Sequence, residues 1–520
     1  MMPTTIQPII IALLSGVLMG LAPAPFNAWY FAWFALAPLW ILIRQQKSIK
    51  QIAILAFAWG IGYYGLALFW ITGVHPMMWL GVPWLASIAI AGFCWIFITL
   101  WGTIIIAVSW GVINGFINYK VGIKSLFGSL IRVLIGVALW CSLETICSHT
   151  PLWWSTIAYT QSPHNLVILQ LGKISGFNTV SAVIVAVNGL LAEAVLYWRN
   201  TVYLKTRLLY LVSPLIVLII SHLGGYYLYQ IPVSKDNLSP LKVGIIQGNI
   251  PNEIKLYSEG WRKAIAGYTS GYQRLAKQGV DVVLTPEGAL PFYWDDIIDG
   301  SSFYQAVITA KVPAWVGANG RDGTSYTNSI FTLTGEGKTY SRYNKYKLVP
   351  LGEYIPFESV LGGLIDRLSP LNAHLAAGEP NQIFDTPFGR AIIAICYESA
   401  FPQPFWRQAK AGGEFIITAS NNAHYSKTMP TQHHAHDVMR AIESDRWAAR
   451  ATNTGYSAIV DPHGNTLWIS AIDRYAIHAD TIYRRQNKTL YVRLGDWLTP
   501  TLLFASVLGL FFERKFSHTR

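Results

Sequence analysis

Charged residues are scarce in this sequence: Lys, Arg, Asp and Glu make up only 13% of 520 residues, whereas 52% are hydrophobic. A soluble domain usually carries about 25% charged residues, so this composition excludes a disordered chain and one that is soluble throughout. Acidic residues are almost missing from the first 230 positions, where ten Lys and Arg accompany only Glu144 and Glu193. Residues 231–512 hold 26 basic and 24 acidic residues, and this near-neutrality argues against a nucleic-acid groove.

Long hydrophobic runs fill the N-terminal part and return once near the C-terminus. A spanning helix needs about 20 apolar residues with few charges. Eight stretches qualify or nearly so, namely residues 6–23, 27–43, 51–71, 83–108, 127–147, 166–196, 208–228 and 497–512. We therefore predict a multi-pass helical membrane domain over residues 1–228, and a C-terminal transmembrane helix with its tail over 497–520. Glu144 and Glu193 fall in or beside these stretches, either as functional or pairing carboxylates or as side chains that reach water.

The connections between these stretches alternate in charge. Every second one is basic, with Arg44, Lys47, Lys50, Lys120, Lys124, Arg132, Arg199, Lys205, Arg207, Arg514, Lys515 and Arg520. The intervening connections, residues 23–27, 72–81 and 148–165, contain no Lys or Arg. Because basic loops stay in the cytoplasm, we expect both termini to be cytoplasmic and residues 229–496 to lie outside.

Residues 229–496 differ in character from the rest. Short apolar runs alternate with amphipathic stretches, a pattern typical of an α/β domain with its own core. We expect strands at residues 243–247, 281–285, 314–317, 328–333, 391–396, 414–418 and 456–460, and helices at 260–277, 402–411 and 431–449.

Cysteine is rare, with four residues in the chain. Cys94, Cys141 and Cys147 lie in apolar stretches, where a free thiol is most often a small buried hydrophobe. Cys396 is the one cysteine of the outer domain, so it has no partner there for a disulfide. It is either a buried structural residue at a strand end or a reactive thiol.

Three side chains that could take part in catalysis stand in distinctive local contexts. Glu287 follows an apolar strand, Lys345 follows Tyr-Asn, and Cys396 ends another strand and precedes Tyr397 and Glu398. A thiol that attacks an ester or amide carbonyl needs a base for its proton and a positive group for the developing oxyanion. Glu287, Lys345 and Cys396 supply these three roles.

These residues resemble the nitrilase superfamily in their order and local motifs: Pro-Glu287, Tyr-Asn-Lys345 and Ile-Cys396-Tyr-Glu398. Further segments are similar to the apolipoprotein N-acyltransferase family. They are Gln247-Gly-Asn-Ile-Pro251, residues 348–356, residues 439–443 with Arg446, and residues 452–455. The resemblance covers the whole chain, because this family joins a helical membrane bundle to an extracytoplasmic nitrilase-like domain closed by one C-terminal span.

The resemblance implies an α-β-β-α sandwich for residues 229–496 and a two-step acyl transfer in a bacterial inner membrane. Cys396, deprotonated by Glu287, takes an acyl chain from a phospholipid while Lys345 steadies the oxyanion. The α-amino group of a diacylglyceryl-cysteine at a lipoprotein N-terminus then receives the chain. Glu353, Tyr397 and Glu398 resemble supporting residues, Glu353 pairing with Lys345 and Glu398 lying near the thiol. No cofactor is implied, and the sequence has no Gly-rich phosphate loop.

Three features depart from this family or invite another interpretation. Residues 420–425 read Ser-Asn-Asn-Ala-His-Tyr where relatives commonly read Ser-Asn-Asp-Ala-Trp-Phe, and Leu256 stands where Trp is expected. A histidine cluster, His433, His434 and His436, lies near His424 and Asp437. It is either a zinc site or a polar helix face or pocket rim, and because the defined zinc-binding spacings are missing we expect no metal.

Three functions from different classes remain open at this point. We favour the acyltransferase. A membrane-tethered amidase or nitrilase-type hydrolase would use the same three residues, with water in place of the amine. A transporter or receptor whose outer domain only binds would not need Cys396.

Overall fold

The computed structural model describes residues 6–120, 126–200, 204–233, 239–323, 325–350, 352–354 and 375–517. The chain divides into two compact units. The helical unit comprises Met1–Thr72, Ala91–Ile231 and Leu494–Arg520, and the sheet unit comprises Gly73–Ile90 and Pro232–Arg493. Among the residues named in the sequence analysis, Pro356, Lys124 and Arg520 lie outside the described residues, as do the side chains of Lys120, Arg199, Lys205, Arg514 and Lys515.

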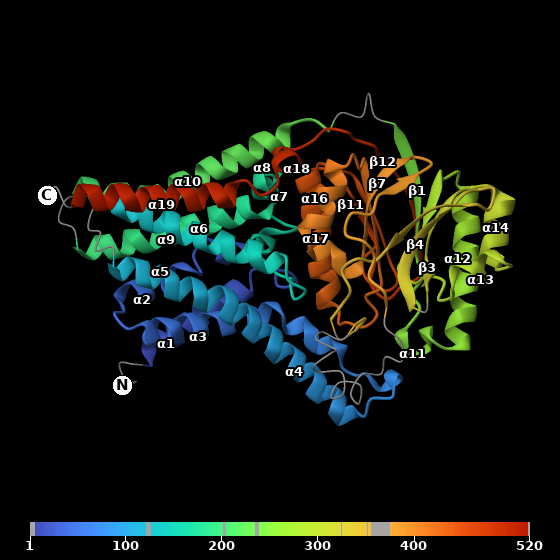
Figure 1. Cartoon of the computed structure of the whole chain (residues 1–520), viewed down its shortest axis with the longest axis horizontal. Coiled ribbons are helices and arrows are strands. Elements are labelled where there is room, and N and C mark those ends of the chain that lie inside the picture. The colour runs from blue at the N-terminus through green and yellow to red at the C-terminus, as the bar shows by residue number, and fades with distance from the viewer. Residues whose placement is uncertain are drawn as a thin grey trace. The chain divides into compact units, whose positions relative to one another are not determined.

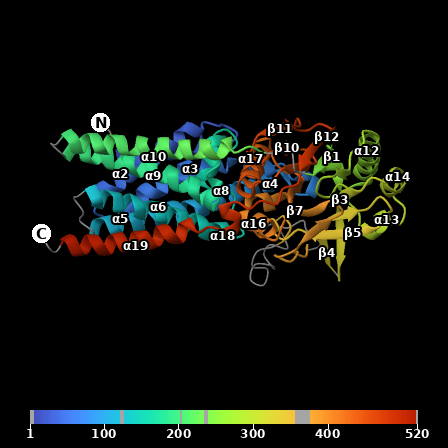
Figure 2. The same cartoon turned by 90° about the horizontal axis from the view of Figure 1, so that it is seen from above.

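Long helices run alongside one another in the helical unit (Figures 1 and 2). They are α1 (Gln7–Gly20), α2 (Ala37–Gln45), α3 (Ile49–Ala67), α5 (Ser109–Lys120), α6 (Leu126–Ser148), α9 (Phe177–Asn200), α10 (Leu204–Gln230) and α19 (Leu498–Ser517), while α4 (Trp84–Gly102) begins in the sheet unit. Five helices of the described residues are long and apolar enough to cross a membrane: Ile49–Ala67, Trp84–Ile117, Phe127–Ser148, Phe177–Trp198 and Arg207–Gln230. The chain is therefore a membrane protein by its helices.

Two of the predicted stretches are not single helices. Residues 27–43 form a short 3-10 helix, Trp29–Trp33, followed by α2, which has Pro38 in its first turn. Proline lacks a backbone N–H and is tolerated at a helix start, so it favours a new helix there. Residues 166–196 contain two four-residue helices, α7 (Leu166–Leu169) and α8 (Gly172–Ser175), before α9. The division into domains at residues 228 and 496 stays a prediction.

The buried carboxylates of the helical unit have polar partners. Glu193 forms an ion pair with Arg132 at 2.6 Å and lies 3.7 Å from the Arg44 guanidinium. The Glu144 carboxylate accepts hydrogen bonds of 2.6–2.7 Å from Thr156, Ser181 and the Ile157 N–H. A buried carboxylate is tolerated when such partners replace water, so both residues have a structural role within the bundle.

Two six-stranded sheets form the sheet unit, with strand orders β12-β1-β2-β3-β4-β5 and β11-β10-β9-β8-β7-β6. The first sheet consists of β1 (Pro240–Gln247), β2 (Val282–Leu284), β3 (Ala314–Asp322), β4 (Ser325–Leu333), β5 (Thr339–Asn344) and β12 (Ala476–Tyr483). The second consists of β6 (Phe384–Thr386), β7 (Gly389–Ile395), β8 (Phe415–Ser420), β9 (Ala448–Thr452), β10 (Ala458–Val460) and β11 (Thr466–Ile469). Strands β1, β2 and β3 are parallel, as are β7, β8 and β9.

Helices cover the outer faces of both sheets (Figure 1). On one side lie α12 (Ser258–Lys277), α13 (Trp294–Ile298) and α14 (Ser302–Ala310), and on the other α16 (Pro402–Lys410) and α17 (Thr428–Ser444). Side chains alternate along each strand: Val243 and Ile245 enter the core between the sheets, and Ile246 joins the core under α12. This arrangement confirms the predicted α-β-β-α sandwich.

The helix predicted over residues 431–449 is wrong at its C-terminal end. Helix α17 stops at Ser444, Asp445 adopts a left-handed conformation with φ +55°, and the chain then enters strand β9. The Asp445 carboxylate accepts a 2.6 Å hydrogen bond from Arg485, which fixes this turn. The strand escaped the sequence analysis because its residues are Ala-Ala-Arg-Ala-Thr, without an apolar β-branched run.

Four strands end next to the predicted site residues or their neighbours. Glu287 lies three residues after β2, Cys396 directly after β7, Asn421 directly after β8 and Lys345 directly after β5. In α/β folds, the carboxyl ends of parallel strands commonly bear the functional site.

Candidate active site

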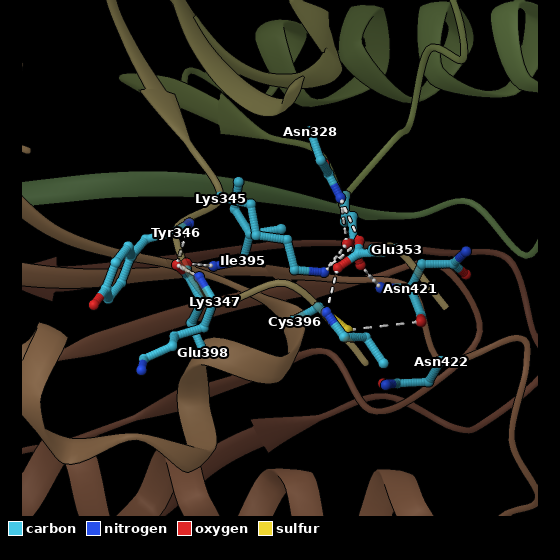
Figure 3. A network of polar contacts seen from close by, with 12 residues as sticks. Asn328, Lys345, Tyr346, Lys347, Glu353, Ile395, Cys396, Glu398, Asn421 and Asn422 are labelled. Atoms are coloured by element: carbon cyan, nitrogen blue, oxygen red, sulfur yellow. Dashed lines mark hydrogen bonds and ion pairs between the residues drawn. The ribbon is translucent and has the colours of Figure 1, made fainter. Parts of the chain in front are cut away.

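Lys345 lies between two carboxylates (Figure 3). Its Nζ is 2.9 Å from Glu287 Oε1 and 2.8 Å from Glu353 Oε1. Asn328, from strand β4, donates a 2.6 Å hydrogen bond to the same Oε1 of Glu287. The Lys345 side chain is 1% exposed, so these contacts replace the water that a buried ammonium would otherwise lose.

Local backbone contacts hold Glu287 and Lys345 in place. Glu287 lies in the turn after β2, which continues through Gly288 at φ +54°. A Cβ at Gly317 of β3 would stand 2.0 Å from the Pro286 carbonyl oxygen, so this close approach requires glycine. The Lys345 N–H donates a 2.8 Å hydrogen bond to the Asn328 carbonyl, which extends the β4–β5 pairing to the lysine.

Cys396 is connected to Glu287 through one residue, Asn421. The Asn421 N–H donates to Glu287 Oε2 at 2.8 Å, and the Asn421 carbonyl oxygen lies 4.0 Å from Cys396 Sγ. Cys396 is 6% exposed and has φ +53°, a left-handed conformation that residues with a Cβ rarely adopt. Strained backbone of this kind clusters at active sites, because the fold must hold it in place.

Electrostatics links the three predicted residues. Burial and the Glu287 carboxylate raise the pKa of the Cys396 thiol to about 12, while the Lys345 ammonium acts in the opposite direction. Burial disfavours the charge on Glu287, yet Lys345 and Lys255 hold the pKa of its carboxyl below the ordinary value. The two carboxylates outweigh burial at Lys345 and keep its pKa well above the ordinary value. The resting site therefore has a protonated thiol, an ionised carboxylate and an ammonium.

Glu398 and Tyr397 lie next to Cys396 in sequence and make different contacts from it. The Glu398 carboxylate is fully buried and accepts hydrogen bonds of 2.7–3.1 Å from Tyr343 Oη and from the N–H groups of Tyr346, Lys347 and Ile395. It thereby joins the end of β7 to the chain that follows Lys345. The Tyr397 ring packs edge-on against Phe401, with ring centroids 5.0 Å apart.

Lys255 is a second cation at this site that the sequence analysis missed. Its Nζ lies 3.6 Å from the position that a Cβ on Gly288 would occupy, next to Glu287. Burial lowers the pKa of Lys255 to about 8, although the charges of Glu287 and Cys396 act to raise it. Its place four residues after Pro251, just beyond the segment similar to the family, was the available signal.

His424 stands where the family resemblance leads us to expect Trp. Its Nδ1 lies 2.8 Å from Asn252 Nδ2, and its ring packs against Trp79 with centroids 5.4 Å apart. Trp79 comes from Gly73–Ile90, the segment that belongs to the sheet unit. Burial and the Lys255 ammonium lower the pKa of His424 to about 4, so this histidine is neutral at ordinary pH. Leu256, the other departure, is 55% exposed.

The histidine cluster lies within helix α17, and its members contact different groups. His433 Nε2 is 2.8 Å from the Cys396 carbonyl oxygen, and His434 Nε2 is 3.0 Å from Thr466 Oγ1. In the part of the chain that the structure describes, no group of three or more His, Cys, Asp or Glu side chains is placed to hold a metal ion.

Two family models match this chain. Residues 242–473 match the carbon-nitrogen hydrolase family, and residues 15–190 match the apolipoprotein N-acyltransferase N-terminal domain. A solved amidase from Nesterenkonia sp. aligns over 48% of this chain and 92% of its own, at 15% identity and a TM-score of 0.36.

Three cyanobacterial relatives match along nearly the whole chain. A protein of Nostoc sp. is 57% identical over 94% of this chain and 96% of its own length. One of Synechocystis sp. is 50% identical over 96% and 99%, and one of Thermosynechococcus vestitus is 40% identical over 95% and 93%. All three are named apolipoprotein N-acyltransferase. Since identity of this extent covers both the helices and the sandwich, the chain belongs to the apolipoprotein N-acyltransferase family.

Proposed function

We propose that this apolipoprotein N-acyltransferase works through Cys396 as nucleophile, Glu287 as general base and Lys345 as oxyanion stabiliser. The observation that carries this assignment is the junction at Asn421. The Asn421 N–H donates a hydrogen bond to the Glu287 carboxylate, and the Asn421 carbonyl oxygen lies next to the Cys396 thiol. Glu287 also forms an ion pair with Lys345. A base, a nucleophile and a cation are thus gathered at one buried point.

In the first step, the Cys396 sulfur attacks the carbonyl carbon of a phospholipid acyl ester. Glu287 takes the thiol proton, because a thiol with a pKa of about 12 is not ionised at neutral pH. Lys345 stabilises the tetrahedral oxyanion. The ester C–O bond then breaks, Glu287 returns the proton to the departing alkoxide, and a lysophospholipid leaves behind a thioester on Cys396.

In the second step, the α-amino group of a diacylglyceryl-cysteine at an apolipoprotein N-terminus attacks this thioester. Glu287 accepts the amine proton, a C–N bond forms, and the C–S bond breaks to regenerate the thiol. Donor and acceptor thus react in turn, in a ping-pong order. Glu353 assists by sharing Lys345 Nζ with Glu287, and Glu398 assists by fixing the chain on both sides of the site.

We further propose that residues 229–496 lie outside the cytoplasmic membrane of a bacterium, between the membrane domain of residues 1–228 and the C-terminal span of 497–520. The alternation of basic and uncharged connections supports this orientation, with both termini in the cytoplasm. Both lipid substrates then meet the enzyme at the outer leaflet.

The test is the intact mass of the purified full chain after incubation with vesicles of a phospholipid that carries one kind of acyl chain. We expect one added acyl chain on Cys396, absent in Cys396→Ala. A diacylglyceryl-cysteine peptide with a free amine should discharge it, and the same peptide with an acetylated amine should not. A thioester that disappears equally fast without peptide would indicate the hydrolase instead.

A further inference from the structure

The carbonyl group of Cys396 has a side-chain partner on helix α17. His433, which is completely buried, places its Nε2 2.8 Å from this oxygen. A carbonyl oxygen can only accept a hydrogen bond, so Nε2 must carry a hydrogen. In a neutral imidazole the other nitrogen, Nδ1, is then an acceptor.

Asn422 supplies the donor that Nδ1 requires. Its Nδ2 lies 3.2 Å from His433 Nδ1 and 3.4 Å from the sulfur of Met429. Its Oδ1 faces Arg450 Nη2 at 3.5 Å, and a guanidinium has only donors. The amide is therefore oriented from both ends, with its oxygen toward Arg450 and its nitrogen toward His433.

The charges around His433 act in the same direction. Burial, Arg450 of β9, His436 of the same helix and Lys345 all lower the pKa of His433, against the effect of the Cys396 carbonyl, and the result is well below the ordinary value. The imidazole is therefore neutral, and its single hydrogen is on Nε2. A series of hydrogen bonds thus runs from Arg450 through Asn422 to His433. It ends in one N–H donor directed at the Cys396 carbonyl.

We propose that His433 is a positioning residue for the nucleophile, held in the correct tautomer by Asn422. This proposal rests on the proposed function of Cys396. It also gives a role to two residues that the reaction itself leaves unused, His433 and Asn422.

The backbone of Cys396 explains why such a partner is needed. A residue with a Cβ at φ +53° is strained, and neighbouring groups must hold it there. The hydrogen bond from His433 fixes the orientation of the peptide plane that follows Cys396, and hence the turn from which the thiol projects. Without this bond the turn has more freedom to relax, and the sulfur leaves the position from which it reaches the ester carbon.

The experiment measures single-turnover thioester formation by the full-length protein with phospholipid vesicles, in three variants. His433→Leu removes the donor and keeps an apolar volume. His433→Gln can still donate an N–H to the carbonyl. His434→Leu is the matched control, because His434 is the next residue of the same helix, is also buried and contacts Thr466 rather than Cys396.

We expect His433→Leu to lower the maximal acylation rate by about ten- to a hundredfold, the range that follows from losing the partner of one buried polar group. The half-saturating phospholipid concentration should not change, because the lost contact acts on the nucleophile. His433→Gln should recover most of the rate, and His434→Leu should keep it. If His433→Leu reacts at the wild-type rate, or if His433→Gln is as slow as His433→Leu, the positioning role is wrong.

Two further measurements keep this test separate from folding and from the proposed function. If His433→Leu does not fold, Asn422→Leu serves instead, since it removes the donor to Nδ1 and should slow acylation, and an unchanged rate would overturn the proposal. Cys396→Ala is run beside the other variants. Thioester formation or turnover in that variant would overturn the proposed function itself, whereas an inactive Cys396→Ala with a fully active His433→Leu would overturn only the positioning role.

Discussion

Glu287 and Lys345 form an ion pair of 2.9 Å in which both side chains are buried. The positive charge of the proposed oxyanion stabiliser thus balances the negative charge of the proposed base. The pair keeps the carboxylate ionised while the thiol remains protonated, because it holds the pKa of Glu287 below its ordinary value. Removing either partner should therefore change the protonation of the site as well as a contact.

Glu287→Gln should slow thioester formation by about 10² to 10⁴-fold, the usual contribution of a positioned general base. The amide keeps the shape of the side chain but cannot accept the thiol proton. The rate should recover in part as the pH rises, because the lost carboxylate also raised the pKa of the thiol. Single-turnover acylation across a pH series measures this. A deficit that stays constant up to alkaline pH would argue against the base.

Lys345→Met should slow both acylation and transfer to the amine, by about 10² to 10³-fold each, because both steps pass through an oxyanion. Alkaline pH should not restore either rate to the wild-type level, because the deficit persists even where Glu287 is ionised. Without the ammonium, burial dominates at Glu287 and raises its pKa, so the acidic limb of the profile should move to higher pH. Rescue of this variant at high pH, together with no rescue of Glu287→Gln, would mean that the two roles are reversed.

Lys255→Met should also move the acidic limb of the pH profile of the acylation rate to higher pH, because Lys255 helps to lower the pKa of Glu287. Lys255→Arg keeps the charge and is the control. In the unchanged enzyme this contribution should fade as the pH rises through about 8, where burial places the pKa of Lys255. An identical acidic limb in Met and Arg variants would show that the Lys255 charge has no influence on the base.

Glu398→Gln should destabilise the fold by about 1 to 3 kcal/mol, because an amide NH₂ would replace one oxygen that now accepts backbone N–H groups. Burial raises the pKa of Glu398 to about 7, although its backbone hydrogen bonds act to lower it. The folded state therefore binds a proton more readily than the unfolded chain, and this contribution to stability is complete below the ordinary carboxyl pKa and lost as the pH rises through 7.

Thermal unfolding of the two proteins at pH 5 and pH 8 checks both points. The wild-type Tm should fall more between these values than the Tm of Glu398→Gln. Glu379→Gln, at an exposed position, is the control and should resemble the wild type at both values. If Tm changed equally with pH in all three proteins, the titration of Glu398 would not explain the pH dependence of stability.

The membrane orientation can be tested with single cysteines introduced at Gln46 and Ser301. A membrane-impermeant thiol reagent applied to intact cells should label the cysteine at 301 and not the one at 46, because the basic connection that contains Gln46 is expected in the cytoplasm. Both should be labelled after lysis. Labelling at position 46 alone in intact cells would invert the topology.

Much of the sandwich was predictable because its central strands are continuous apolar runs, such as residues 391–395, which are buried on both faces. Strands without that signal were missed. Strand β12 reads Ala-Ile-His-Ala-Asp-Thr-Ile-Tyr and is half-buried along most of its length, and β11 has only four residues. Such strands form because a neighbouring strand supplies backbone hydrogen bonds. The local amino-acid sequence gives no sign of this pairing.

The predicted site residues come from side-chain type and motif, and these say nothing about main-chain atoms. Asn421 contributes its N–H and its carbonyl oxygen to the site, and any residue type would provide them. Asn328 was more accessible to prediction, since a polar amide inside the predicted strand 328–333 already required a partner. The sequence analysis placed His433, the partner of the Cys396 carbonyl, in a cluster without a metal, but it could not identify the group that His433 contacts.

The segment Gly73–Ile90 follows α3 in the chain and includes the start of α4. It nevertheless belongs to the sheet unit. A Cβ on Gly73 would collide with the Ser426 N–H group at 2.6 Å, Trp79 covers His424, and Tyr257 Oη donates to the Trp79 carbonyl at 3.3 Å. The sheet unit of this enzyme is thus encoded by two separate segments of the chain. A recombinant fragment that began at residue 232 would lack Trp79 and with it the ring that packs against His424, so the sheet unit should be purified and engineered only as part of the full-length chain.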